Sequence, residues 1–196
     1  MQGKQAKGLT PKQEAMILHQ LGRMRYPQRD TAMFLLSVKA GLRAKEIASL
    51  TWAMVTDAEG QVADTLHLED RARKGNKGGR TIPLHPSLHA ALVALHAHRG
   101  AEAWPDRPVL HSERGRGLSA ATVQLWFYRL YTSLGLTGCS SHSGRRTFIT
   151  RAARKGAEAG GSLRDVQQLA GHTSLATTQR YIEGDTDAKR KLITLI

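Results

Sequence analysis

The sequence contains a single cysteine, Cys139, among its 196 residues. One thiol cannot form an intramolecular disulfide, and a lone cysteine provides no thiolate cluster for zinc. Long hydrophobic runs are also missing, because the longest nearly apolar stretch, 32–38, is far shorter than the ~20 residues that span a bilayer. Residues 1–8 are basic and lead into no apolar segment, so no secretory signal is predicted. We therefore expect a cytoplasmic protein without covalent cross-links and without a membrane partner.

Acidic residues are scarce: 16 Asp and Glu stand against 29 Lys and Arg, which gives a formal net charge of +13 at pH 7. A basic excess of this size favours polyanionic partners, and nucleic acid is the commonest of these. Hydrophobic residues (40%) and charged residues (23%) occur at ordinary globular frequencies, which excludes wholesale disorder. The length suits one sizeable core, so we expect a single domain over 1–196 with a flexible start at 1–8.

Helix signals dominate the chain. Thr10 can cap a helix that begins at Pro11, and Gln13 can complete a capping box. Ser162 can cap a second helix in the same way, and Gly171 suits the left-handed position after its last residue. Apolar spacing and these caps predict helices over 10–22, 31–40, 44–50, 88–95, 119–134, 142–155, 162–170, a segment through 181, and a tail helix within 186–196.

Two short segments, 65–68 and 80–84, are alternating or β-branched and flank the turn-rich, basic sequence 74–79. This pattern is typical of a β-hairpin with a basic tip. The sequence therefore predicts an α+β fold that is mainly helical, with one small antiparallel sheet.

Six side chains belong to the types that a phosphodiester reaction needs. An arginine lies at a helix junction after Gly41-Leu42, and a lysine lies beside the hairpin turn. A histidine and an arginine three residues apart begin one helix and so share a face. A second histidine follows Gly171, and a tyrosine lies nine residues later. In chain order these residues are Arg43, Lys74, His142, Arg145, His172 and Tyr181.

The motifs around these residues resemble those of the tyrosine recombinases, also called the phage integrase family. Gly41–Ile47 is similar to the first arginine box, Lys74–Lys77 with Ile82–Leu84 to the lysine hairpin, and His142–Arg145 to the His-x-x-Arg box. Leu169–His172 and Thr177–Tyr181 resemble the histidine and nucleophile segment. The resemblance extends from about Leu9 to the C-terminus and implies the family's catalytic-domain fold.

Attack on a DNA phosphate builds negative charge on two nonbridging oxygens, and the guanidiniums of Arg43 and Arg145 can bind both without a metal or other cofactor. By resemblance, Tyr181 attacks the phosphorus and forms a 3′-phosphotyrosyl link. The resemblance also implies that His142 accepts the tyrosine proton, Lys74 protonates the departing 5′-oxygen, and His172 hydrogen-bonds a nonbridging oxygen. Glu46, one turn after Arg43, is predicted to fix the orientation of that arginine.

Other basic residues are predicted to contact the DNA backbone, and these are Lys77, Arg80 and Arg146. Lys77 shares the turn with Lys74 and is the alternative general acid, although Lys74 fits the motif better. His85, His89 and His96 are interpreted as a solvated helix face, since no carboxylate or cysteine partner lies near them to complete a metal site.

Only 42 residues precede Arg43, so we expect no separate N-terminal DNA-binding domain, as in short fimbrial switch invertases. The resemblance implies a prokaryotic or phage-encoded recombinase that acts on double-stranded DNA and assembles on it, with the apolar 186–196 tail docked on a neighbouring copy or on its own core. A non-catalytic DNA-binding regulator and a type IB topoisomerase-like enzyme are the alternative functions.

Overall fold

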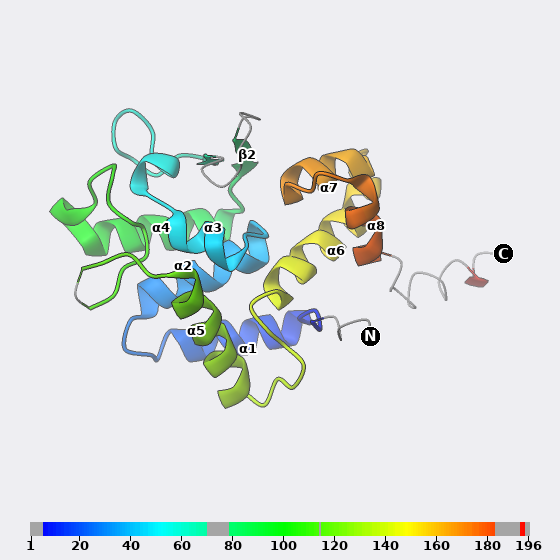
Figure 1. Ribbon diagram of the computed structural model, residues 1–196, viewed down its shortest axis with the longest axis horizontal. Coiled ribbons are helices and arrows are strands. Elements are labelled where there is room, and N and C mark those ends of the chain that lie inside the picture. Colours follow the sequence, from blue (N-terminus) through cyan, green and yellow to red (C-terminus); the bar gives the residue numbers. More distant parts are fainter. Residues whose placement is uncertain (1–5, 70–78, 114, 183–192, 195–196) are drawn as a thin grey trace. The chain divides into compact units, whose positions relative to one another are not determined.

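The computed structural model describes residues 6–69, 79–113, 115–182 and 193–194 (Figure 1). The chain divides into two compact units, Met1–Phe148 and Ile149–Ile196, and each is treated by itself below. Helix α6 contains the boundary between them. The elements in chain order are α1 (Pro11–Leu21), α2 (Pro27–Lys39), α3 (Ala44–Ser49), η1 (Trp52–Met54), β1 (Thr65–Leu68), β2 (Arg80–Pro83), α4 (Pro86–Arg99), η2 (Gly100–Glu102), α5 (Ala120–Ser133), α6 (Ser143–Glu158), α7 (Leu163–Ala170) and α8 (Leu175–Ile182).

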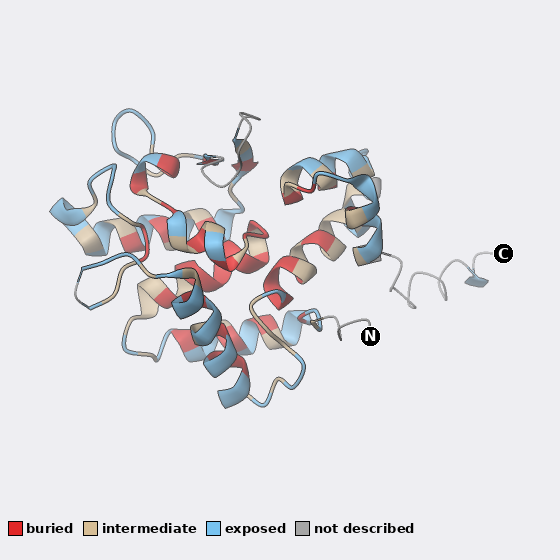
Figure 2. Cartoon of the chain, viewed as in Figure 1, coloured by how far each residue is buried: buried red, intermediate tan, exposed pale blue. Residues whose placement is uncertain are grey.

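Helix α2 is the centre of the first unit. It packs against α1, α3 and α4, and every residue from Ala32 to Val38 is buried (Figure 2). A helix that is apolar nearly all round is stable only when other elements cover all its faces. The predicted segment 31–40 is confirmed as helix but begins earlier, because Pro27 occupies a first-turn position that its fixed φ suits.

Strands β1 and β2 form the predicted antiparallel hairpin, with Leu68 opposite Arg80. Leu66 and Ile82 pair across the sheet and are both buried, so one face of the hairpin is anchored in the core. Gly79 leaves no room for a side chain, because a Cβ there would overlap the carbonyl oxygen of Leu68 and lie 3.0 Å from its carbon. The turn at 70–78 falls outside the described residues.

The predicted starts of α1 and α7 and the predicted end of α7 are confirmed by capping contacts. Thr10 and Gln13 make a capping box at α1, and Ser162 and Asp165 make another at α7. Gly171 takes the left-handed conformation (φ 61°, ψ 43°) after α7. Local sequence therefore sets these boundaries. Helix α6 extends beyond the predicted end at 155, as far as Glu158.

The histidines of α4 depart from the predicted solvated face. His85 precedes the helix and caps it by accepting from the N–H of Ser87. His89 reaches the carbonyl oxygen of Val62 at 3.2 Å, and His96 packs edge-on against the buried Trp52 ring. Two of the three rings therefore make contacts with the protein, one through a hydrogen bond and one through ring packing. Among the described residues, no cluster of His, Cys, Asp and Glu could hold a metal ion, and no helix is long and apolar enough to cross a membrane.

Candidate active site

Glu46 holds Arg43 at two points. Gly41 (φ 66°) turns the chain after α2, and Arg43 then precedes the first residue of α3 in an extended conformation. The backbone N–H of Arg43 donates to Glu46 Oε2 at 2.7 Å, and its Nη1 donates to Oε1 at 3.0 Å. The geometry thus contains the contact expected between Arg43 and the glutamate one turn later.

Arg80 binds the same carboxylate from the hairpin. Its Nη2 lies 3.1 Å from Glu46 Oε2, and its side chain is 16% exposed. The sequence predicted Arg80 as a contact to the DNA backbone, whereas the structure places its guanidinium against a protein carboxylate. One acidic side chain therefore connects α3 to the first residue of β2.

Arg145 belongs to the same group of charges. The side chain is 1% exposed, and its Nη1 donates to the carbonyl oxygen of Gly41. Helix α6 comes very close to α2 here, because a Cβ on Gly144 would overlap Ser37 and lie 3.1 Å from its backbone carbon. The structure thus brings Arg43 and Arg145, which are far apart in sequence, to the neighbourhood of one glutamate.

The three arginines change the acidity of Glu46. Burial raises the pKa of this carboxyl, but the positive charge of Arg80 lowers it. The backbone hydrogen bond from Arg43 and the charges of Arg43 and Arg145 act in the same direction. Their combined effect holds the pKa of Glu46 below its ordinary value, so the residue is an anion among cations at neutral pH.

His142 is exposed at the start of α6, in the same unit as these arginines. Its backbone N–H lies 3.3 Å from Ser140 Oγ, and its carbonyl oxygen accepts from the N–H of Arg146 in the first turn of the helix. Arg146 is half-buried beside it. The imidazole thus lies at the surface, while Arg145, three residues later, is enclosed.

The second unit brings His172 and Tyr181 together. His172 is 8% exposed and lies directly after the left-handed Gly171. Its ring stacks on that of Tyr181, with centroids 5.4 Å apart and planes inclined by 25°. Two of the predicted groups therefore meet within one compact unit.

Thr178 is a functional candidate to which sequence reasoning assigned no role. Its hydroxyl lies 2.9 Å from His172 Nδ1, and the residue is fully buried. Thr178 and Tyr181 are three apart on α8 and so share a face, which is the only signal in the sequence that links them. The threonine fixes the plane of the imidazole and occupies one of its two nitrogens.

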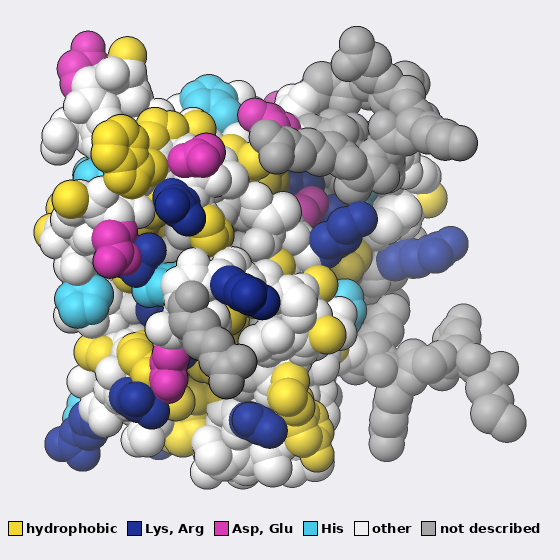
Figure 3. All heavy atoms as spheres, turned by 60° about the vertical axis from the view of Figure 1, so that its left-hand side comes forward, with side chains coloured by type: hydrophobic (Ala, Val, Ile, Leu, Met, Phe, Trp, Pro, Cys, Tyr) yellow, Lys and Arg dark blue, Asp and Glu magenta, His cyan; other side chains and the backbone are white. Residues whose placement is uncertain are grey.

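Two of the predicted basic residues, Lys74 and Lys77, lie outside the described residues, as does most of the predicted tail at 186–196. On the face of the molecule in Figure 3, Lys and Arg side chains are spread among hydrophobic ones and form no continuous patch.

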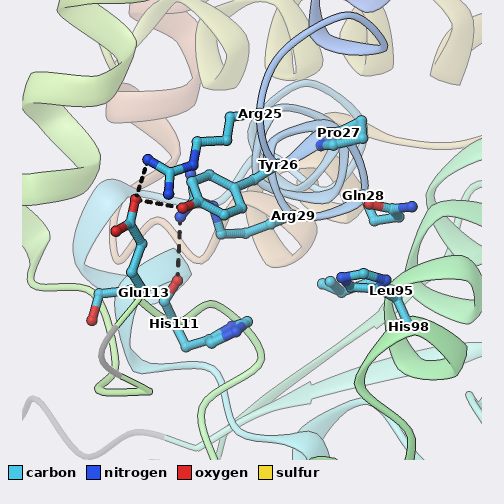
Figure 4. A pocket seen from close by; sticks show the side chains of 10 residues that line it. Arg25, Tyr26, Pro27, Gln28, Arg29, Leu95, His98, His111 and Glu113 are labelled. Atoms are coloured by element: carbon cyan, nitrogen blue, oxygen red, sulfur yellow. Dashed lines mark hydrogen bonds and ion pairs between the residues drawn. The ribbon is translucent and has the colours of Figure 1, made fainter.

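A surface pocket of about 440 Å³ lies at the other end of α2 and is lined by none of the predicted site residues (Figure 4). Its charges are matched within the protein: Arg25 pairs with Glu113 at 2.9 Å, and Arg29 pairs with the buried Asp30 at 2.7 Å. The guanidinium of Arg29 also covers the ring of Tyr26 at 4.3 Å. Two arginines face two carboxylates in this pocket, whereas three arginines act on the single carboxylate of Glu46.

The Phage integrase family model matches residues 7–187. The chain belongs to this family. It is 31% identical over 159 residues to the tyrosine recombinase XerC of Brucella suis biovar 1 (strain 1330), an alignment that covers 81% of this chain and 47% of the relative. The chain therefore spans about half the length of the relatives it matches.

Solved structures agree on the fold. The crystal structure of XerA recombinase superposes with a TM-score of 0.76 at 24% identity, over 96% of this chain and 64% of that one. The XerH site-specific recombinase bound to palindromic difH substrate, in a post-cleavage complex, gives a TM-score of 0.73 at 21% identity, over 96% of this chain and 53% of that one. The predicted mainly helical fold with one small antiparallel sheet is confirmed.

Proposed function

We propose that this chain is a site-specific DNA recombinase that breaks and rejoins double-stranded DNA through Tyr181. The observation that carries the proposal is the cluster in which the charges of Arg43 and Arg145 both act on Glu46, because two guanidiniums in one neighbourhood can bind the nonbridging oxygens of a phosphodiester. Membership of the phage integrase family and the bacterial XerC relative support it and favour a prokaryotic or phage-encoded origin.

In the proposed reaction the phenol oxygen of Tyr181 attacks the scissile phosphorus, and the bond to the 5′-oxygen breaks. The products are a 3′-phosphotyrosyl link and a free 5′-hydroxyl. The phenol proton passes to His142, and Lys74 gives a proton to the departing oxygen. A second 5′-hydroxyl reverses these steps on a new partner strand without ATP, because the phosphotyrosine keeps the energy of the original bond.

The arginines stabilise the charge that develops during attack. Arg43 and Arg145 bind the nonbridging oxygens, and His172 donates a third hydrogen bond to one of them. Preorganised donors of this kind each contribute about 10²–10³-fold to the rate. We further propose that copies of the chain assemble on the DNA, with the 186–196 tail as the candidate contact; the XerH complex with difH supports double-stranded DNA as the partner.

The test is covalent capture from a pool of nicked duplexes with randomised arms, so that one experiment reports both the adduct and the sequences that form it. Wild-type protein should form an adduct that resists denaturation and that survives enrichment and sequencing. Tyr181→Phe should abolish the adduct. Tyr128→Phe, which changes an exposed tyrosine on α5 in the same way, is the matched control and should retain it.

Three results would contradict the proposal. An adduct that persists in Tyr181→Phe would place the nucleophile elsewhere. Binding without any adduct would favour the non-catalytic regulator. Relaxation of supercoiled plasmid with no enriched sequence would favour the topoisomerase-like enzyme.

A further inference from the structure

The two oxygens of Glu46 have different partners. Oε1 accepts from the guanidinium of Arg43, whereas Oε2 accepts from the backbone N–H of Arg43 and lies 3.1 Å from Arg80 Nη2. A carboxylate bound through both oxygens cannot rotate about its last bond without breaking one of these contacts. Arg80 therefore helps to fix the plane in which Glu46 presents Oε1 to Arg43.

Exposure separates the two arginines. The side chain of Arg43 is 40% exposed, whereas that of Arg80 is 16% exposed. Arg80 directs its guanidinium at a partly buried carboxylate, and Arg43 is the more accessible cation of the two.

The hairpin holds Arg80 in place. Arg80 is the first residue of β2 and pairs with Leu68, while Ile82, two residues later, is buried against the core. Gly79 allows the backbone to approach β1 closely just before it. The guanidinium is thus carried on a paired β-strand that is anchored in the core two residues later.

We propose that Arg80 is a positioning residue that acts through Glu46 to orient the Arg43 guanidinium for the phosphate. This inference rests on the proposed recombinase function. It reassigns Arg80 from the DNA backbone to the protein side of the site. It also makes strand β2 a structural support for Arg43, the residue that precedes α3.

The decisive experiment is a double-mutant cycle with the full 196-residue chain. Single-turnover cleavage is measured on the duplex enriched in the covalent capture, at saturating protein, for wild type, Arg80→Ala, Glu46→Ala and the double variant. Arg80→Ala should slow cleavage by about 10- to 100-fold, the range for an outer group that orients a ligating side chain. In the Glu46→Ala background the same substitution should have no further effect. Independent, multiplying effects would overturn the proposal.

Salt dependence of duplex binding gives a second readout that a positioning role leaves unchanged. A lost phosphate contact lowers the slope of log affinity against log salt by about 0.9. Arg80→Ala should keep the wild-type slope, and so should Arg107→Ala, an exposed arginine in the same unit that controls for the charge change. If the slope falls by about 0.9 in Arg80→Ala but not in Arg107→Ala, Arg80 contacts a phosphate and the proposal is overturned.

Two conservative variants keep the test valid if Arg80→Ala does not fold. Arg80→Lys retains a cation for Glu46 Oε2 and should recover part of the cleavage rate, whereas Arg80→Gln retains size without charge and should recover less. The reverse order would contradict a role through the carboxylate. Failure of the wild type to form any adduct would count against the recombinase function itself, while adduct formation with additive Arg80 and Glu46 effects would count only against the positioning role.

Discussion

Arg145 donates a hydrogen bond from Nη1 to the carbonyl oxygen of Gly41, 104 positions earlier in the chain. This contact ties the buried arginine of α6 to the turn that precedes Arg43. It also gives Gly41 a structural role, since its φ of 66° lies in the left-handed region, which disfavours residues with a side chain at this turn. The two predicted arginine boxes are thus connected by a hydrogen bond to the main chain, and both arginines also act on the charge of Glu46.

We predict that Gly41→Ala is more damaging than a positive φ alone explains. An alanine Cβ would overlap the Phe148 ring, with Cγ at 2.9 Å. Gly60 has a similar φ of 77° but nothing within 4 Å of such a Cβ, so Gly60→Ala isolates the backbone cost of about 1–2 kcal/mol. Urea unfolding should give Gly41→Ala a further loss of about 1–3 kcal/mol, and cleavage should fall with it. Equal losses for the two variants would contradict the clash.

We predict opposite effects for two glycines of α6. Gly144→Ala would force a Cβ to 2.9 Å from Ser37 Cβ, and overpacking of this kind costs about 1–3 kcal/mol. Gly156→Ala meets only Val166 Cγ2 at 3.8 Å, an ordinary contact, so the gain in helix propensity should stabilise the protein by up to about 1 kcal/mol. Thermal unfolding of both variants measures the contrast. A stabilised Gly144→Ala variant would refute the close approach of α6 to α2.

We predict that Thr178→Val removes the contact that orients the His172 ring. The substitution keeps the shape of a fully buried side chain but removes the hydroxyl at Nδ1. A buried polar group left without its partner costs about 1–3 kcal/mol, and adduct formation should slow because the imidazole is no longer held in one plane. Thr178→Ser should restore both properties. Thr177→Val, one position away and only half-buried, is the control and should behave like wild type.

We predict an acid-dependent loss of stability at Glu46. Its pKa is lower in the folded protein than the ordinary value of 4.5, so the carboxylate stabilises the fold at pH values above 4.5. That contribution is lost as the pH falls through the lowered folded pKa. Unfolding free energies of wild type and Glu46→Gln should therefore differ most near neutral pH and converge as the pH falls below 4.5. A constant difference between the two proteins down to pH 3 would contradict this assignment.

We predict that cleavage continues in EDTA. In the proposed mechanism the charge on the transition state is balanced by Arg43 and Arg145, which need no ion to remain cationic. Adduct yield on the enriched duplex should be the same with EDTA and with added Mg²⁺. A requirement for a divalent cation would show that the guanidiniums alone do not supply the stabilising charge.

Much of the local structure was predictable because it depends on neighbouring residues. Helix starts are fixed by contacts between residues three positions apart, Thr10 with Gln13 and Ser162 with Asp165. Gly171 ends α7 for a reason confined to its own backbone. The contact of Glu46 with Arg43 is of the same kind, since the two are one helical turn apart.

The contacts that define the site required the folded chain. Arg80 faces Glu46 across 34 positions, and no spacing rule distinguishes an arginine that binds phosphate from one that binds a carboxylate. Thr178 gave no signal beside His172, because its hydroxyl matters only where burial removes competing water. Sequence spacing alone also predicts a solvated face for the histidines of α4. The contact of His96 with the buried Trp52 ring involves a different part of the chain, which spacing does not reveal.

The sequence by itself therefore determined the presence of the helices, the ends that capping residues set at α1 and α7, the paired strands and the residue types available for chemistry. Hydrogen bonds and apolar periodicity within a few residues govern these features. Tertiary structure alone decided that Arg80 and Arg145 share the electrostatic environment of Glu46 and that Thr178 holds His172. Such contacts depend on packing between distant segments, where a displacement of one ångström makes or breaks a charged hydrogen bond.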